Sequence, residues 1–283
     1  MKQSLDSVKR GFAQMLKGGV IIDVTSPDDA KLAEHVGAVA VLVTEKLAAD
    51  TRGTDYIGRM ADPKVITEIS SAVTIPVIAK VRLGHISEAQ ILAELNVDMI
   101  FESDDTPAPG ICYIDKCEFS TPFVCGASTL SGALKRIDEG ASMIRINGDS
   151  GSGSVSELIG NIRTISSEVR ALVENRNSSS FLAKKADEYG VCFELVEDTA
   201  KIGRLPVACF AAGGISTPAD VALAMHMGCD GVFVGSGIFK AQHPDKMAKA
   251  LVFASDNYSK PDILAKVTSA AGRPMPAKKK LQA

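Results

Sequence analysis

Short apolar runs alternate with longer helical patterns along almost the whole chain. Several of these runs are apolar at consecutive positions rather than at alternate ones, which is typical of strands covered by helices on both faces of a parallel sheet. Eight repeats of this kind in about 250 residues are typical of a (β/α)8 barrel, an α/β fold. The predicted strands are Gly19–Val24, Ala38–Glu45, Pro76–Arg82, Val97–Ser103, Pro122–Ala127, Met143–Asn147, Val207–Ala212 and Gly231–Gly235.

Capping residues mark the starts of several helices. Ser26 and Thr217 are each followed by a proline and then by acidic residues within the first turn. The side-chain oxygen accepts a hydrogen bond from a free N–H of the first turn, the proline has no N–H that needs a partner, and the helix dipole favours the acid. A third helix is predicted over Ser87–Asn96.

The connection between the sixth and seventh predicted strands is long, roughly sixty residues. Its pattern predicts helices over Val155–Glu174 and Phe181–Tyr189, which we interpret as an inserted helical segment and not as a second domain. We therefore expect a single barrel domain over residues 1–283, with an N-terminal helix in residues 1–17. Two prolines and three consecutive lysines predict a frayed basic tail over residues 273–283.

Composition excludes several classes of function. The formal charge is −3, from 31 basic and 34 acidic residues, so there is no field of one sign to bind nucleic acid or an anionic membrane. No apolar run approaches the ~20 residues that span a bilayer. The six cysteines form no C-x-x-C pair and there are only four histidines, which argues against a disulfide framework and a metal site. We expect a soluble cytoplasmic protein.

A lysine and an aspartate interrupt apolar strands near their carboxyl ends, where barrel enzymes place their active sites. Lys80 lies within the third predicted strand and Asp23 within the first. A buried amine needs a partner or a chemical task, and it can attack a carbonyl group to form an imine. The alternative is a structural ion pair of Lys80 with Asp23 or Glu102. His85, in the following loop, is a candidate substrate-binding residue or an ordinary hydrogen-bonded histidine.

Glycine-rich turns follow the last three predicted strands. The loops after the seventh and eighth strands of such barrels commonly bind phosphate through backbone N–H groups. The alternative is that these glycines only make tight turns. The residues thus predict a barrel enzyme with a lysine nucleophile that acts on a phosphorylated carbonyl compound, and they leave aldolases, isomerases and synthases open. The turns contain Gly148–Gly153, Gly213–Gly214 and Gly235–Gly237.

Six segments, spread over most of the chain, resemble the synthase (lyase) subunit of glutamine-dependent pyridoxal 5′-phosphate synthase. They are Met15–Val24, Arg59–Pro63, Ile75–His85, Thr121–Gly126, Glu139–Arg145 and Phe210–Lys240. The resemblance implies synthesis of pyridoxal 5′-phosphate (vitamin B6) from ribose 5-phosphate, glyceraldehyde 3-phosphate and ammonia, with the coenzyme as product and no cofactor. It further implies a glutaminase partner that supplies ammonia and a dodecamer of two hexameric rings.

The resemblance also assigns roles to residues. Lys80 matches the lysine that forms the imine with the pentose, and Asp23 matches its acid/base partner. The positions that match the sugar-phosphate site are Gly151, Gly214, Gly235 and Ser236. The positions that match positively charged residues are Lys135, Arg136 and Arg145, the first conservatively changed from arginine.

Three positions depart from the family pattern. Asn147 replaces a second lysine that takes over the intermediate, Phe101 replaces an aspartate, and Tyr113 replaces a histidine. An amide cannot form an imine, so we expect the early chemistry to be preserved and the later chemistry to be impaired. A catalytically defective paralogue that assembles with active subunits is the alternative. An unrelated sugar-phosphate isomerase or a thiazole-synthase-like barrel is a third interpretation.

Overall fold

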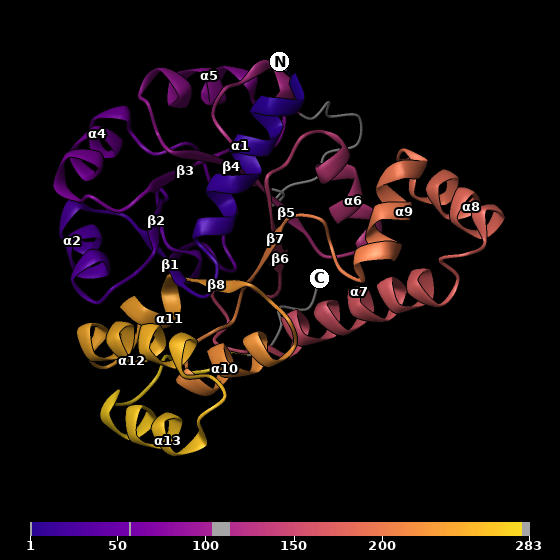
Figure 1. Ribbon diagram of the computed structural model, residues 1–283. Coiled ribbons are helices and arrows are strands. Elements are labelled where there is room, and N and C mark those ends of the chain that lie inside the picture. Colours follow the sequence, from indigo (N-terminus) through magenta and orange to yellow (C-terminus); the bar gives the residue numbers. More distant parts are fainter. Residues whose placement is uncertain (1, 57, 104–113, 279–283) are drawn as a thin grey trace.

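Eight parallel strands close into a barrel in the order of the chain, from β1 to β8 and back to β1 (Figure 1). The computed structural model describes residues 2–56, 58–103 and 114–278, with side chains from residue 7 onward. The predicted (β/α)8 barrel is confirmed, and every strand falls within a predicted run. The strands are β1 Val20–Val24, β2 Ala40–Val43, β3 Val77–Val81, β4 Met99–Glu102, β5 Phe123–Ala127, β6 Met143–Asn147, β7 Ala208–Ala212 and β8 Gly231–Val234.

Helices surround the barrel. In Figure 1, α2 and α4 cover one side, while α7, α8 and α9 extend away from the opposite side. Across the described ranges, none of the helices combines the length and the apolar character needed to cross a membrane. The helices are α1 Lys2–Met15, α2 Pro27–His35, α3 Ala48–Thr51, α4 Pro63–Ala72, α5 Ile86–Glu94, α6 Leu130–Asp138, α7 Ser156–Glu174, α8 Ser179–Tyr189, α9 Phe193–Ile202, α10 Pro218–His226, α11 Ser236–Phe239, α12 Pro244–Asp256 and α13 Pro261–Ala270.

Two of the three predicted helix starts have the expected cap. The Ser26 side chain accepts a hydrogen bond from the Asp29 N–H, and Thr217 forms a reciprocal capping box with Asp220 at the start of α10. The start of α5 differs from the prediction, since the cap is His85 and not Ser87. His85 Nδ1 accepts from the Glu88 N–H at 3.3 Å, so an imidazole performs the task expected of a hydroxyl.

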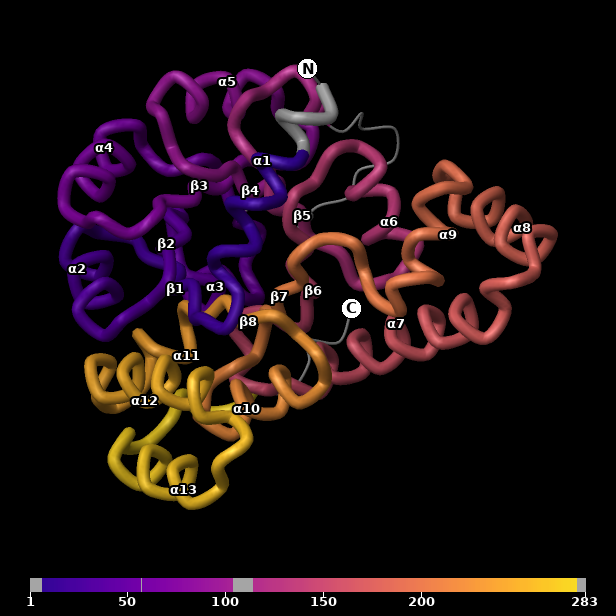
Figure 2. Tube along the Cα trace, viewed as in Figure 1, coloured from indigo at the N-terminus to yellow at the C-terminus, as the bar shows by residue number. Residues whose placement is uncertain are grey.

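The connection from β6 to β7 leaves the barrel and returns through three helices (Figure 2). The predicted helices over Val155–Glu174 and Phe181–Tyr189 correspond to α7 and α8. The third, α9, was not predicted. Its cap residue, Cys192, makes no side-chain capping hydrogen bond, so its start lacks the usual sequence signal.

The barrel interior forms its own packed group of side chains. It includes Phe101, Phe210 and Phe233, together with Ala13 of α1 and Leu16 just after that helix. Since α1 precedes β1 directly and packs into this group, it closes the amino-terminal end of the barrel. The opposite end, where the strands finish, is left for a site.

The chain after α13 folds back onto the carboxyl end of the barrel. Met275 is only 4% exposed, and the Lys278 N–H donates to the Ser152 carbonyl at 2.7 Å. A buried methionine and backbone hydrogen bonds thus hold residues 273–278, part of the segment that the sequence predicted as a frayed tail. Residues 279–283 and Tyr113 lie outside the described residues.

Candidate active site

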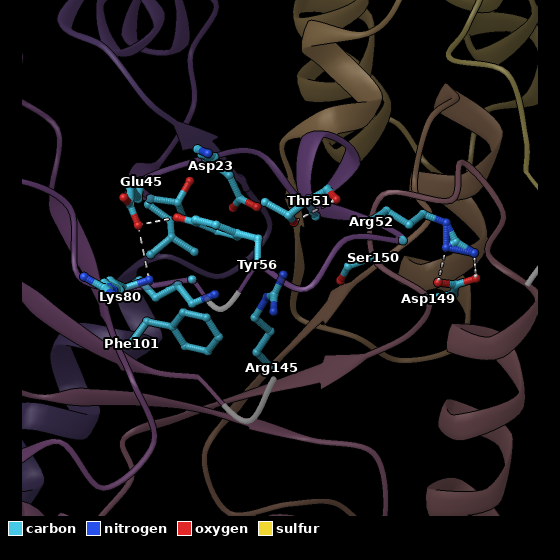
Figure 3. Close-up of a pocket in the computed structure, with 17 residues that line it drawn as sticks. Asp23, Glu45, Thr51, Arg52, Tyr56, Lys80, Phe101, Arg145, Asp149 and Ser150 are labelled. Atoms are coloured by element: carbon cyan, nitrogen blue, oxygen red, sulfur yellow. Dashed lines mark hydrogen bonds and ion pairs between the residues drawn. The ribbon is translucent and has the colours of Figure 1, made fainter. Parts of the chain in front are cut away.

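A cavity of about 360 Å³ opens at the carboxyl ends of the strands, and Lys80 and Asp23 both line it (Figure 3). Lys80 lies beside Phe101 in the register of β3 and β4. It also shares the inward side of β3 with Ile78, because alternate residues of a strand point to the same face. The predicted lysine and aspartate thus reach one cavity from separate strands.

Asp23 also lies directly against the glycine turn that follows β8. A Cβ atom at Gly235 would come within 2.7 Å of the Asp23 Cβ and 3.0 Å of its Oδ2. Glycine is therefore required where this turn passes the carboxylate. The acid of β1 and the turn after β8 are parts of one surface.

A smaller hollow lies beside the Lys80 cavity, and six of the residues that line it are glycines. Gly151, Gly214, Gly235 and Ser236 line it together, so the structure brings all four predicted phosphate-site residues to one place. We call this hollow the glycine cradle. At Gly214 the backbone has φ +79°, and an added Cβ would lie 1.9 Å from the Ser154 carbonyl oxygen.

The glycine cradle and the Lys80 cavity are adjacent, because they share part of their walls. The shared residues are Asp23, Ala48, Arg145 and Ser150. An anion held by backbone N–H groups in the cradle would therefore lie next to the cavity that contains the lysine.

Arg145 extends from β6 into the cavity wall between two aromatic rings. Its guanidinium carbon lies 5.0 Å from the ring centre of Phe101 and 5.4 Å from that of Phe233. Such cation–π contacts hold a positive charge against apolar side chains. Arg145 Nη1 also donates to Asn147 Oδ1 at 3.0 Å. Two of the positions that depart from the family pattern, 101 and 147, therefore contact the same arginine.

Lys135 and Arg136 do not line this cavity. They lie on α6 and border a separate hollow of about 330 Å³ near the ends of β4 and β5. His85 caps α5. It lines neither the Lys80 cavity nor the glycine cradle. Lys135 and Arg136 thus lie apart from the residues of the Lys80 cavity, His85 lines none of these three hollows, and the substrate-binding roles of all three residues stay predictions.

A buried ion-pair cluster, which the sequence did not indicate, lies beside that second hollow. Lys116 is fully buried, and its Nζ lies 2.8 Å from Glu102 Oε2 and 3.1 Å from Glu139 Oε2. Glu102 is thus engaged by Lys116, although the sequence offered it as a partner for Lys80. Burial by itself lowers the pKa of the Lys116 ammonium, but nearby Cys125 and the two carboxylates raise that pKa above its usual value.

The loop after β2 contributes further side chains that the sequence did not single out. Tyr56, Glu45, Lys46 and Arg59 all line the Lys80 cavity. The Tyr56 hydroxyl donates a hydrogen bond to Glu45 Oε2 (Figure 3). Burial and this acceptor raise the pKa of Tyr56 to about 12. Glu45 ends a predicted strand, but the other three residues lie outside the predicted strands, so only the folded loop reveals their position.

An ion pair between two residues of the cavity wall connects the same loop to the loop after β6. Arg52 donates to both carboxylate oxygens of Asp149, at 3.0 and 2.8 Å, in a bidentate arrangement (Figure 3). The Ala49 N–H donates to Ser236 Oγ at 2.9 Å.

Within the described part of the chain, no group of three or more His, Cys, Asp or Glu side chains is placed to hold a metal ion.

Comparison with known proteins gives a consistent result over most of the chain. The model of the SOR/SNZ family matches residues 5–212, and that of the thiazole biosynthesis protein ThiG matches residues 193–267. The pyridoxal 5′-phosphate synthase subunit PdxS of Dictyoglomus turgidum is 54% identical over 272 residues, which cover 96% of this chain and 92% of that protein. PdxS of Methanosarcina mazei is 50% identical, with 97% and 91% covered. PdxS of Thermoanaerobacter pseudethanolicus is 53% identical, with 95% and 91% covered.

Proposed function

The chain belongs to the SOR/SNZ family, and from this premise we propose that it is the synthase subunit of a pyridoxal 5′-phosphate synthase, acting in vitamin B6 biosynthesis. The observation that carries the proposal is the position of Lys80 and Asp23 in one cavity that shares part of its wall with the glycine cradle. An amine that reacts with a phosphorylated sugar needs both parts within reach of one small molecule.

The proposed first step is imine formation with ribose 5-phosphate. The sugar phosphate binds in the cradle, and the neutral amine of Lys80 attacks the aldehyde carbon. A C–N bond forms, the carbonyl oxygen becomes a hydroxyl group, and this group leaves as water when the imine forms. Asp23 transfers the protons that these steps require, since a carboxyl group at the edge of the cavity is a suitable acid and base.

Mass spectrometry tests this step directly. The protein is incubated with ribose 5-phosphate, reduced with borohydride and digested. On the peptide that contains Lys80 we expect a mass gain equal to one ribose 5-phosphate, minus one water and plus two hydrogens. Lys80→Met should lose the adduct and the exposed-lysine control Lys184→Met should keep it. A folded wild-type protein that gains no mass on Lys80 would contradict the proposal.

We propose that completion of the coenzyme is impaired because position 147 has no amine. Turnover is measured with ribose 5-phosphate, glyceraldehyde 3-phosphate and an ammonium salt, following the chromophore of the product. Asn147→Lys should raise the rate, and Asn147→Lys combined with Phe101→Asp should raise it further. The reason is electrostatic: a lysine alone at 147 would face the Arg145 guanidinium, and a carboxylate at 101 would offset that repulsion. A wild-type rate that equals the rate of both variants would contradict impairment.

The second candidate is a catalytically defective paralogue that assembles with active subunits and regulates them. The replacements at 101 and 147 favour it, because fold and assembly surfaces can persist when a catalytic group is lost. Co-expression with an intact relative and native mass measurement separate the candidates: mixed rings support the paralogue, and rings of this chain alone contradict it. A dodecamer of two rings, a glutaminase partner and a place in the cytoplasm form part of the proposal.

A further inference from the structure

The ring of Tyr56 forms part of the wall of the cavity around Lys80. A Cβ placed on Gly58 would lie 3.1 Å from Lys80 Nζ and 3.9 Å from Tyr56 Cε1. The amine and the edge of the phenol ring therefore approach the same point. Phe101 lies beside Lys80 on the neighbouring strand, so the amine has an aromatic residue on the barrel wall and another on the loop (Figure 3).

Tyr56 is held in this place by contacts on several sides. Its hydroxyl donates to Glu45 Oε2, and the Arg59 N–H donates to the same oxygen at 3.3 Å. Its own N–H donates to Thr54 Oγ1 at 3.2 Å. Lys46 Nζ lies 4.5 Å from the ring centre, in a cation–π contact. A ring fixed in this way restricts the shape of the cavity instead of yielding to whatever enters.

The position of the ring relative to the cradle indicates what it restricts. Tyr56 lines the Lys80 cavity, whereas the residues lining the glycine cradle do not include it. A phosphorylated aldehyde anchored in the cradle would extend toward Lys80, and Tyr56 bounds the space around the carbon that reacts. The bulk of the substrate at that end is therefore limited by the ring.

We propose that Tyr56 is a specificity-determining residue that restricts the Lys80 reaction to short phosphorylated aldehydes. The inference rests on the proposed imine chemistry of Lys80. The ring acts by steric exclusion, and the Glu45 hydrogen bond holds the ring in place. Removing the ring should admit larger aldehydes, while removing the hydroxyl alone should keep most of the selection.

The test compares adduct formation with ribose 5-phosphate and glucose 6-phosphate, trapped by borohydride and quantified by intact mass. The rate for each sugar is divided by the wild-type rate for the same sugar, so the small open-chain fraction of each sugar cancels. We expect Tyr56→Ala to raise the glucose 6-phosphate to ribose 5-phosphate ratio about tenfold, a size typical of discrimination by pocket shape. Tyr56→Phe should stay within about twofold of the wild type. Tyr258→Ala, which removes a tyrosine that packs on His226, is the matched control.

Three results would overturn the proposed role of Tyr56, and they can be told apart. Adducts on Lys80 with an unchanged ratio in Tyr56→Ala would overturn the role of Tyr56 and leave the proposed function intact. A ratio that rises as much in Tyr56→Phe as in Tyr56→Ala would show that the hydrogen bond of the hydroxyl to Glu45, and not the ring, makes the selection. That result also overturns the proposed role of the ring. A wild-type protein that forms no adduct with either sugar would remove both the proposed function and this inference.

Discussion

Lys116 lies in a buried cluster of ion pairs, where a single substitution has a large effect on the stability of the fold. It is fully buried, it contacts the carboxylates of Glu102 and Glu139, and its Nζ donates to the Ile114 carbonyl at 3.1 Å. Removing charges from water is costly, and this cost is offset here by short contacts on several sides. The cluster is therefore sensitive to the loss of any one partner.

We predict that Lys116→Met destabilises the fold by about 3–5 kcal/mol, because it leaves the buried Glu102 carboxylate without its main counter-charge. The free energy of unfolding is measured in urea. Lys184→Met is the control, since its ion pair with Glu188 spans 3.9 Å between exposed side chains and should contribute less than about 1 kcal/mol. Equal losses in the two variants would show that the burial of Lys116 is unimportant.

Cys125 lies next to this cluster, and burial raises the pKa of its thiol from an ordinary value near 9 to about 12. The folded pKa is the higher one, so the neutral thiol contributes stability below pH 9. That contribution is lost as the pH rises from about 9 toward 12. We predict that Cys125→Ala loses less free energy of unfolding than the wild type does when the pH is raised from 8 to 10.5, as measured in urea.

The burial and raised pKa of Cys125 also predict its reactivity. A thiol reagent at pH 8 should label the exposed Cys117 and leave Cys125 unmodified, as read by peptide mapping. Labelling of both in the folded protein would contradict it.

The sequence revealed some of these residues and not others, for a physical reason. Lys80 and Asp23 were visible because a charged residue interrupts an apolar strand. Lys116 lies in the polar stretch Asp115–Glu118, and its burial depends on residues distant in sequence, such as Glu102 of β4 and Lys9 of α1. Tyr56 lies in a loop, and its place over Lys80 depends on hydrogen bonds that no periodic pattern reports.

Strands were easier to predict than the helices and loops that connect them. The strands of a barrel are covered on both faces, so their apolar runs stand out from the sequence around them. Helix starts were visible where a hydroxyl cap precedes a proline, as at Ser26 and Thr217. They were misplaced or missed where the cap is His85 or Cys192, because those side chains are not typical caps.

A pair of glycine substitutions tests how tightly the glycine cradle is built. We predict that Gly214→Ala lowers stability by about 2 kcal/mol or more, because φ is +79° and the new methyl group would overlap the Ser154 carbonyl. Gly160→Ala, on α7 with open space around it, should stabilise the protein by about 0.5–1 kcal/mol. Thermal unfolding gives both values, and a neutral effect of Gly214→Ala would show that the cradle is loosely packed.

For the molecule as a whole, the two ends of the barrel are built differently. The amino-terminal end is closed by α1, since Ala13 of this helix and Leu16 just after it pack into the interior. At the other end, segments far apart in the sequence meet over the glycine cradle. Ala48 lies over Gly151, and Met275 is among the residues that line the cradle. The barrel itself was predictable from its repeats, whereas this meeting of loops depends on contacts across the whole chain.

The last segment of the chain should therefore affect ligand binding more than folding. The closed ring of strands does not include residues 273–283, so their removal should leave the barrel folded. The same removal takes Met275, a buried side chain, from the wall of the cradle. We predict that the truncated protein binds ribose 5-phosphate about tenfold more weakly by calorimetry, which is about 1.4 kcal/mol of binding free energy, because Met275 no longer completes the wall of the cradle. Removing residues 279–283 alone keeps Met275 and serves as the control. Equal affinity in the two truncated proteins would show that the segment from 273 to 278 has no part in binding.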